Sequence, residues 1–227
     1  MYSIIDLFSQ KDFTTIVSLP QNRIDLAHAA IEGGADALKF HINVSHRASG
    51  NEFAGIEEYT ETFKEIRECF KGPMGIVLGE DIDKINTIEA SLLKEIGFNY
   101  FSLYAKDISS KWITQNDLER TVAIDSNFSL DEIQVMELLN IDAIELSIIN
   151  KEHYGEKLNL EDLIKYKSFR ERTRLPLVVP TQKKIDEKDI PLLKGIGINA
   201  VMLGVVSIGD SEKSIYENVS RIVKNTK

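Results

Sequence analysis

Hydrophobic residues recur along this chain in two alternating patterns. Short apolar runs rich in Val, Ile, Leu and Phe are each followed by a longer segment with apolar positions every three to four residues. The short runs are typical of buried strands, and the longer segments are typical of amphipathic helices. The predicted strands are 13–20, 37–43, 74–79, 100–106, 121–125, 143–149, 176–181 and 200–206. The predicted helices are 22–32, 56–70, 84–96, 113–118, 130–139, 160–173, 188–196 and 212–223.

Eight strand–helix pairs in 227 residues predict a (β/α)8 TIM barrel, a fold of typically about 250 residues. A similar tetrapeptide precedes every second predicted strand: GADA from Gly34, GFNY from Gly97, NIDA from Asn140 and GINA from Gly197. An open doubly wound sheet is the rival architecture, but it does not require eight units. We therefore predict one barrel domain spanning residues 1–227.

Polar side chains occupy the strand positions that should face the barrel interior. Because neighbouring strand residues point to opposite faces, apolar positions turned to the helices leave the polar ones inside. The residues predicted to face inward are Lys39, His41, Asn43, Ser102, Tyr104, Lys106, Ala123, Asp125, Glu145, Ser147, Met202 and Gly204. A barrel interior is normally an apolar core, and unpaired buried charges cost several kcal/mol each. The set indicates a buried ion-pair network of Lys39, Glu145, Asp125 and Lys106, an active site at the C-terminal mouth, or both.

The candidate catalytic residues are titratable side chains of this inward set. Lys39, His41, Asp125 and Glu145 could move a proton next to a carbonyl carbon, because they supply acids and bases from opposite sides of the barrel. Lys106 could instead be a Schiff-base nucleophile. An ion pair with Asp107 or Asp125 is the structural alternative for Lys106.

Two loops at the end of the chain have the composition of a phosphate site. Phosphate sites in (β/α)8 barrels are frequently formed by the loops after the last two strands and a helix N-terminus. The candidate phosphate-binding residues are Thr181, Gln182 and Lys183 after the seventh strand, and Gly204, Val205 and Ser207 after the eighth. A plain Gly/Ser connection is the alternative.

A polar loop after the second predicted strand is expected to line a substrate pocket. Its candidate substrate-binding residues are Asn43, His46 and Arg47, and Arg47 could bind a carboxylate or a second phosphate. Tyr104 and Ser147 join them from the inward set. His41 and His46, together with Glu80 and Asp81, could bind a metal, because imidazole and carboxylate are ordinary metal ligands, but two histidines five residues apart are a weak signal. We expect no metal and no other cofactor.

The segment from Gly197 to Ser207, GINAVMLGVVS, resembles the last strand and turn of the phosphate-binding (β/α)8 barrels of sugar-phosphate metabolism and of tryptophan and histidine biosynthesis. Within that group, the chain length and the segment MGIVLGE, which starts at Met74, are most similar to N-acylmannosamine-6-phosphate 2-epimerases. The resemblance implies a barrel with a phosphate site. Those epimerases carry a lysine in the third strand, where this chain has Gly79. They also use a glutamate after the seventh strand, where this chain reads VPTQ from Val179 to Gln182.

Composition narrows the class of protein. The chain has 27 Lys and Arg against 36 Asp and Glu, a net charge of −9 that argues against a nucleic-acid partner. No apolar run approaches the ~20 residues of a membrane span, and no signal peptide is recognisable, so we expect a cytoplasmic protein without a membrane partner. Cys69 is the single cysteine and predicts no internal disulfide. Homo-oligomerisation stays open.

These observations predict an enzyme that acts on a small phosphorylated sugar or sugar acid by acid–base proton transfer, as isomerases and epimerases do. Two alternatives remain. One is a lyase, an aldolase that forms a Schiff base through Lys106 or Lys39 with a phosphorylated keto acid or sugar. The other is a non-catalytic barrel that binds a phosphorylated metabolite.

Overall fold

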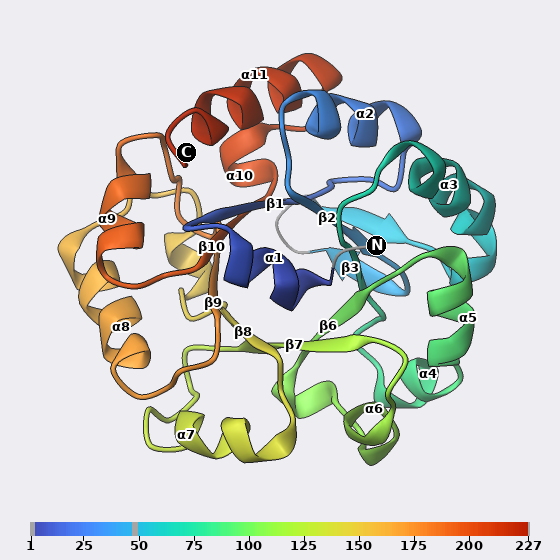
Figure 1. The fold of residues 1–227 in the computed structure, drawn as a ribbon, viewed down its shortest axis with the longest axis horizontal. Coiled ribbons are helices and arrows are strands. Elements are labelled where there is room, and N and C mark those ends of the chain that lie inside the picture. Colours follow the sequence, from blue (N-terminus) through green and yellow to red (C-terminus); the bar gives the residue numbers. More distant parts are fainter. Residues whose placement is uncertain (1–2, 47–49, 227) are drawn as a thin grey trace.

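The computed structural model describes residues 3–46 and 50–226, and it confirms the predicted (β/α)8 barrel. A closed barrel of parallel strands runs in the order β1-β10-β9-β8-β7-β6-β5-β2, with helices on the outside (Figure 1). The barrel strands are β1 (Thr14–Ser18), β2 (Ala37–His41), β5 (Met74–Val77), β6 (Tyr100–Tyr104), β7 (Glu119–Ile124), β8 (Ala143–Leu146), β9 (Leu177–Pro180) and β10 (Ala200–Leu203). In this order β2 and β8 lie diametrically opposite each other.

Helices follow the barrel strands as the alternation of apolar segments predicts. The described helices are α1 (Ile4–Gln10), α2 (Ile24–Glu32), α3 (Ile56–Cys69), α4 (Ile82–Asn86), α5 (Ala90–Ile96), α6 (Ser110–Thr114), α7 (Ile133–Met136), α8 (Leu160–Arg170), α9 (Asp189–Gly195), α10 (Val205–Ile208) and α11 (Glu212–Val223). Short 3-10 turns are η1 (Ala105–Asp107), η2 (Glu137–Leu139) and η3 (Lys151–His153). An antiparallel hairpin, β3 (Val44–His46) and β4 (Asn51–Phe53), follows β2.

The sequence pattern misplaces several boundaries at the strand ends. The strand predicted over 100–106 ends at Tyr104, because the chain turns into η1. The strand predicted over 200–206 ends at Leu203, and the apolar Val205 and Val206 begin the short helix α10 instead. Short apolar runs fit a strand or a buried helix equally well, which is why periodicity alone misses α10.

Helix α1 closes the N-terminal opening of the barrel, where it lies across the centre of the ring in Figure 1. Ile4 and Phe8 are buried against the N-terminal end of the barrel interior. Glu119, at the start of β7, accepts the backbone N–H of Ile4 at 2.7 Å. The Ser3 hydroxyl caps the helix by accepting the N–H of Asp6 at 2.8 Å. With this end closed, the opposite C-terminal mouth is where a ligand can enter.

Glu119 gives the barrel a testable pH dependence. Burial raises the pKa of the Glu119 carboxyl, and the Ile4 N–H opposes the rise. The native state therefore holds this proton more tightly than the unfolded chain, so the contribution is largest at low pH and is lost as pH rises through the ordinary and then the raised pKa. We expect Glu119→Gln, which keeps an oxygen for Ile4, to flatten this fall. Urea unfolding from about pH 4 to pH 7 measures it; identical slopes for both proteins would contradict it.

Tyr100 fills the barrel interior beneath the C-terminal half. Its ring is 1% exposed, and a Cβ added at Gly75 on the neighbouring strand would lie 2.1 Å from it. Its hydroxyl donates to the carbonyl of Leu38 at 3.4 Å. Burial and the carboxylate of Glu145 raise the pKa of the Tyr100 phenol, so this group stays neutral. The ring separates the apolar part of the barrel interior, next to α1, from the polar part at the C-terminal end.

Candidate active site

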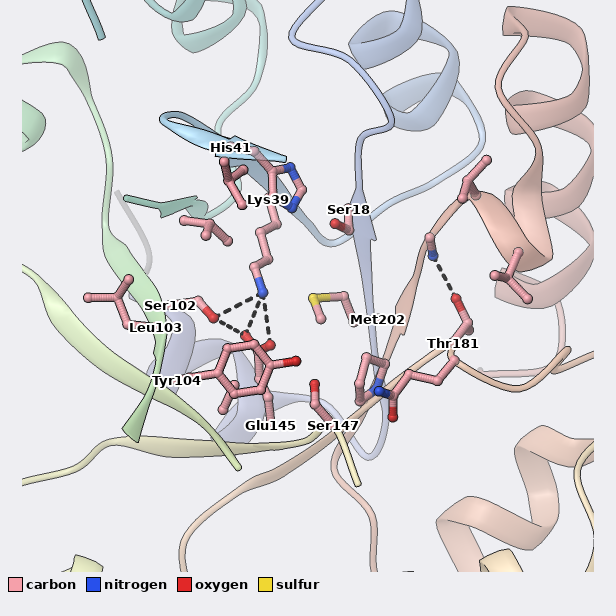
Figure 2. Close-up of a pocket in the computed structure, with 18 of the residues that line it drawn as sticks. Ser18, Lys39, His41, Ser102, Leu103, Tyr104, Glu145, Ser147, Thr181 and Met202 are labelled. Atoms are coloured by element: carbon pink, nitrogen blue, oxygen red, sulfur yellow. Dashed lines mark hydrogen bonds and ion pairs between the residues drawn. The ribbon is translucent and has the colours of Figure 1, made fainter. Parts of the chain in front are cut away.

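A buried ion pair crosses the barrel interior from β2 to β8. The Lys39 ammonium donates to both Glu145 carboxylate oxygens, at 2.9 and 2.8 Å, and to the Ser102 hydroxyl at 2.9 Å (Figure 2). Ser102, from β6, donates to the same carboxylate at 2.7 Å. The exposed fractions of Lys39, Ser102 and Glu145 are 4%, 2% and 3%. Strands on opposite sides of the barrel thus supply the two charges.

The alternation of side chains along these strands explains why the charges meet. Leu38 and Phe40 point outward, and the Phe40 ring packs edge-on against Phe63 of α3 with centroids 5.1 Å apart. Lys39 must then point inward. The pair compensates its own charge and adds hydrogen bonds, which a buried ion pair requires. Of the predicted ion-pair network, only the contact between Lys39 and Glu145 forms, and Ser102 joins it; the other two predicted members, Asp125 and Lys106, lie elsewhere.

The ion pair forms the floor of a cavity of about 160 Å³ at the C-terminal mouth. Figure 2 shows the side chains of this cavity converging from strands around the whole barrel. The polar residues that line it are Ser18, Lys39, His41, Glu80, Ser102, Tyr104, Glu145, Ser147, Tyr154, Thr181 and Gln182. Val44, Val77, Gly79, Leu103, Ala123, Pro180, Met202, Gly204, Val205 and Val206 complete the lining. A cavity of this size fits a small metabolite.

His41 lies one inward position above Lys39 on β2 and lines the same cavity. Its side chain is 2% exposed, and its ring lies 5.0 Å from that of Phe53 in the hairpin. Asn22 holds the backbone of His41 by donating to its carbonyl at 2.6 Å and accepting its N–H at 3.3 Å. These two bonds from one amide fix the end of β2, so the imidazole has a defined place over the floor.

The predicted phosphate segments meet at one side of the cavity. Gly204 donates its N–H to the Thr181 hydroxyl oxygen at 2.7 Å, which joins the end of β10 to the end of β9. Helix α10 then begins at Val205 with its N-terminus at the cavity wall. The first N–H groups of a helix have no partner within it and favour an anion. Thr181, Gln182, Gly204 and Val205 line the cavity, and their binding of phosphate stays a prediction.

Two predicted phosphate ligands lie elsewhere. The Ser207 hydroxyl accepts the N–H of Ile185 at 3.2 Å, because α10 turns this side chain toward the β9–α9 loop. The Lys183 ammonium is 3% exposed and donates to Glu156 at 2.8 Å, with Asp162 at 3.6 Å. Lys183 lies in the turn after β9, which ends at Pro180, and there these two carboxylates bind its ammonium group. Neither residue lines the cavity.

Two predicted catalytic residues also lie outside the cavity. Lys106 was expected to face the interior, but its side chain is 63% exposed in η1 and pairs with Asp107 at 2.7 Å. Asp125 was expected inside as well, but β7 ends at Ile124 and the Asp125 carboxylate accepts the N–H of Asn127 at 2.9 Å. It borders a separate hollow near Lys183. In both places the strand ends before the alternation reaches the residue.

The predicted substrate-binding residues divide into three groups. Tyr104 and Ser147 line the cavity. Asn43 does not, because it adopts a left-handed conformation with φ of 52° where the chain leaves β2 for the hairpin. The side chain of His46 and all of Arg47 lie outside the described residues.

Gly79 explains one departure from the epimerase pattern. Its φ is +142°, a conformation that L side chains rarely adopt, and an added Cβ would lie 3.1 Å from the carbonyl oxygen of Asn43. A lysine at this position would meet the turn that starts the hairpin. Glu80 follows at the cavity rim, while Asp81 caps α4 by accepting the N–H of Asp83 at 2.9 Å.

Four polar residues of the cavity, Ser18, Glu80, Ser102 and Tyr154, were not among the catalytic, phosphate-binding or substrate-binding candidates. Ser18 lies two positions after the inward Ile16 on β1, so the alternation could have identified it. Ser102 was placed inside by the same alternation but given no role. Tyr154 lies in the loop between β8 and α8, where a polar composition suggests solvent exposure. Only the folded loop brings Tyr154 to the mouth.

In the described ranges, no three His, Cys, Asp or Glu side chains are grouped so that they could hold a metal ion. None of the helices within those ranges has the length and apolar character needed to cross a membrane.

Comparison with known proteins reveals similarity in fold alone. No protein-family model and no curated protein matches the sequence. Tryptophan synthase from M. tuberculosis matches in structure with a TM-score of 0.75 and 9% identity over 100% of both chains. The tryptophan synthase A-subunit from Pyrococcus furiosus matches with a TM-score of 0.74 and 12% identity, over 94% of this chain and 98% of that one. Thiamine phosphate pyrophosphorylase from Pyrococcus furiosus gives 0.66 and 11%, over 96% and 97%. These matches show a (β/α)8 barrel, and the resemblance to epimerases remains a prediction.

Proposed function

We propose that this protein is an enzyme that binds a small phosphorylated sugar or sugar acid at the barrel mouth and moves a proton on its carbon skeleton. One observation carries the proposal: the buried pair of Lys39 and Glu145 forms the floor of the cavity whose wall is the N-terminus of α10. The proposed anion site and the proposed acid–base groups therefore face the same small space. One of the proteins with a similar structure is a thiamine phosphate pyrophosphorylase, and its name contains a phosphorylated compound.

The phosphate would lie against the N-terminus of α10. Val205 and Val206 present the free N–H end of this helix, and Gly204 has no side chain to block the approach. The Thr181 hydroxyl oxygen already accepts the Gly204 N–H, so its own proton can be donated to the anion. Short helices after the last strand serve this purpose in many barrels.

The proton transfer would take place above the floor of the cavity. Glu145 is the base that the geometry favours, because its carboxylate is buried under the ligand space and held in orientation by Lys39 and Ser102. His41 stands at the wall and can act as the partner acid or base. The Lys39 ammonium can stabilise negative charge that develops on a substrate oxygen, since such a charge forms close to it.

The Schiff-base alternative has weaker support. Lys106 pairs with Asp107 outside the cavity, and the Lys39 ammonium is engaged by both carboxylate oxygens of Glu145, so neither offers a free amine lone pair. Borohydride reduction in the presence of phosphorylated keto acids and sugars, followed by mass spectrometry, tests this point. We expect no trapped adduct, and a stable adduct on Lys39 would overturn the proton-transfer proposal in favour of an aldolase.

Gly204→Ala tests the phosphate site. The backbone φ of Gly204 is −115°, and an added Cβ would lie 3.6 Å from the Thr181 hydroxyl oxygen, so the variant should fold normally. The methyl group would nevertheless occupy space in front of α10. We expect inorganic phosphate to bind the variant at least about 10-fold more weakly in calorimetry, a loss of about 1.4 kcal/mol.

Gly195→Ala is the matched control, because an added Cβ there meets nothing within 4 Å. Its phosphate affinity should equal that of the wild type. Equal affinity in Gly204→Ala, or no phosphate binding by the wild-type protein at millimolar concentration, would contradict the proposed site.

A further inference from the structure

A hydrogen-bonded chain joins Gln182 to Tyr154 on the β8 side of the cavity. The Gln182 side-chain oxygen accepts the backbone N–H of Ile149 at 3.1 Å. An N–H can only donate, so this contact fixes which end of the amide is oxygen and which is nitrogen. The amide nitrogen then donates to the Tyr154 hydroxyl oxygen at 2.6 Å. The orientation of the amide therefore determines the role of the tyrosine.

The Tyr154 hydroxyl is left with a proton to donate. A phenol has one proton, and its oxygen here accepts from Gln182. Within residues 3–46 and 50–226, no acceptor for that proton is found, and the ring lines the cavity. Tyr154 thus presents a hydrogen-bond donor to whatever occupies the mouth.

The loop that carries Tyr154 is held in place over the cavity. Gly155 donates its N–H to the Gln182 carbonyl at 2.9 Å, and Lys184 donates its N–H to the Glu156 carbonyl at 2.8 Å. The buried Lys183 ammonium adds its contact with the Glu156 carboxylate at 2.8 Å. Three bonds to the β9–α9 loop therefore surround the tyrosine, so its hydroxyl is positioned before a ligand arrives.

The adjacent residues Thr181 and Gln182 serve opposite sides of the cavity. Thr181 bonds to Gly204 at the start of α10, whereas Gln182 bonds to Ile149 and Tyr154 after β8. The donor of Tyr154 consequently belongs to the side of Glu145 and Ser147 rather than to the phosphate side. A ligand whose phosphate lies on α10 would extend its carbon skeleton toward Tyr154.

We propose that Tyr154 is a specificity-determining residue that donates a hydrogen bond to an oxygen of the ligand's carbon skeleton, a hydroxyl or a carbonyl, and does not bind the phosphate. This inference rests on the proposed function. It narrows the ligand to phosphate esters that carry a further oxygen a few bonds away. A site built around such a donor discriminates strongly against analogues that lack the acceptor.

Three phosphate compounds test this inference with Tyr154→Phe and, as a control, Tyr216→Phe on the exposed face of α11. The probes are inorganic phosphate, propyl phosphate and glycerol 3-phosphate; the last two share a three-carbon skeleton, and only glycerol 3-phosphate carries hydroxyls. We expect the wild type to prefer glycerol 3-phosphate to propyl phosphate by about 10-fold or more. Tyr154→Phe should lose this preference and keep its affinity for inorganic phosphate, while Tyr216→Phe should match the wild type.

Every other binding result contradicts either the role of Tyr154 or the proposed function. A Tyr154→Phe variant that binds all three probes more weakly by the same factor would make Tyr154 a phosphate ligand and overturn the inference. A variant that keeps the preference, or a wild type that has none while binding phosphate, would also overturn it. A wild type that binds none of the three probes would instead refute the proposed function. Circular dichroism of both variants establishes that they are folded.

Discussion

Lys39→Met should lower the free energy of unfolding by about 3–5 kcal/mol, because it leaves the Glu145 carboxylate buried without its partner. The methionine keeps much of the lysine's volume, so loss of packing contributes little. Adding Glu145→Gln removes the unpaired charge and retains an oxygen that can accept the Ser102 hydrogen bond. The double variant should therefore be more stable than Lys39→Met alone, which is the signature of a coupled pair.

Urea unfolding of the wild type, both single variants and the double variant measures this coupling. Glu145→Gln alone should also be less stable than the wild type, because the Lys39 ammonium then faces a neutral amide. If the effects of the two substitutions simply add, the residues do not interact in solution as they do in the structure. Lys39 and Glu145 would then not form a coupled ion pair at the floor of the cavity.

Glu145→Gln should also reduce turnover by about 10²- to 10⁴-fold, the usual contribution of a general base. The amide cannot take up the proton, although it occupies the same place under the ligand. Since this variant is also less stable, turnover must be compared with that of a variant destabilised elsewhere. Gly97→Ala serves as that control: Gly97 ends α5 with a φ of +115°, and an added Cβ would lie 2.4 Å from Arg67.

Turnover is measured with whichever phosphorylated sugar the wild type converts, at a temperature where both variants are fully folded. Gly97→Ala should keep near wild-type turnover while Glu145→Gln loses it. A Glu145→Gln protein with turnover within a few-fold of the wild type would make Glu145 a structural residue and remove it from the chemistry.

The fold could be predicted from the sequence because its signal is repeated around the barrel. Each strand has an apolar face packed on helices, so residues such as Leu38 and Phe40 fix the register and turn Lys39 inward without knowledge of any neighbour. The same argument places Glu145 and Ser102 inside. Helix α1 was not predicted, because Ile4–Gln10 is short and its apolar residues are buried only by packing against the barrel opening.

The site was harder to predict, because its outer residues lie where strands end. Alternation fails once the chain turns, which is why Lys106 and Asp125 were wrongly placed inside. Lys183 has the charge of a phosphate ligand, yet Glu156 and Asp162 bind it, and these residues lie far away in sequence. Tyr154 reaches the cavity only through the bonds between two loops. Such contacts are properties of the tertiary structure.

If this cavity moves a proton on a phosphorylated compound, hydrogen–deuterium exchange will occur at the carbon atom concerned. The wild-type protein and the Lys39→Met/Glu145→Gln variant would be incubated in D₂O with a panel of aldose, ketose and sugar-acid phosphates, and proton NMR would follow each carbon-bound hydrogen. We predict that the wild type introduces deuterium next to the carbonyl or carboxyl carbon of at least one compound and that the double variant does not. Binding of these compounds with no exchange by the wild type, or equal exchange by both proteins, would contradict it.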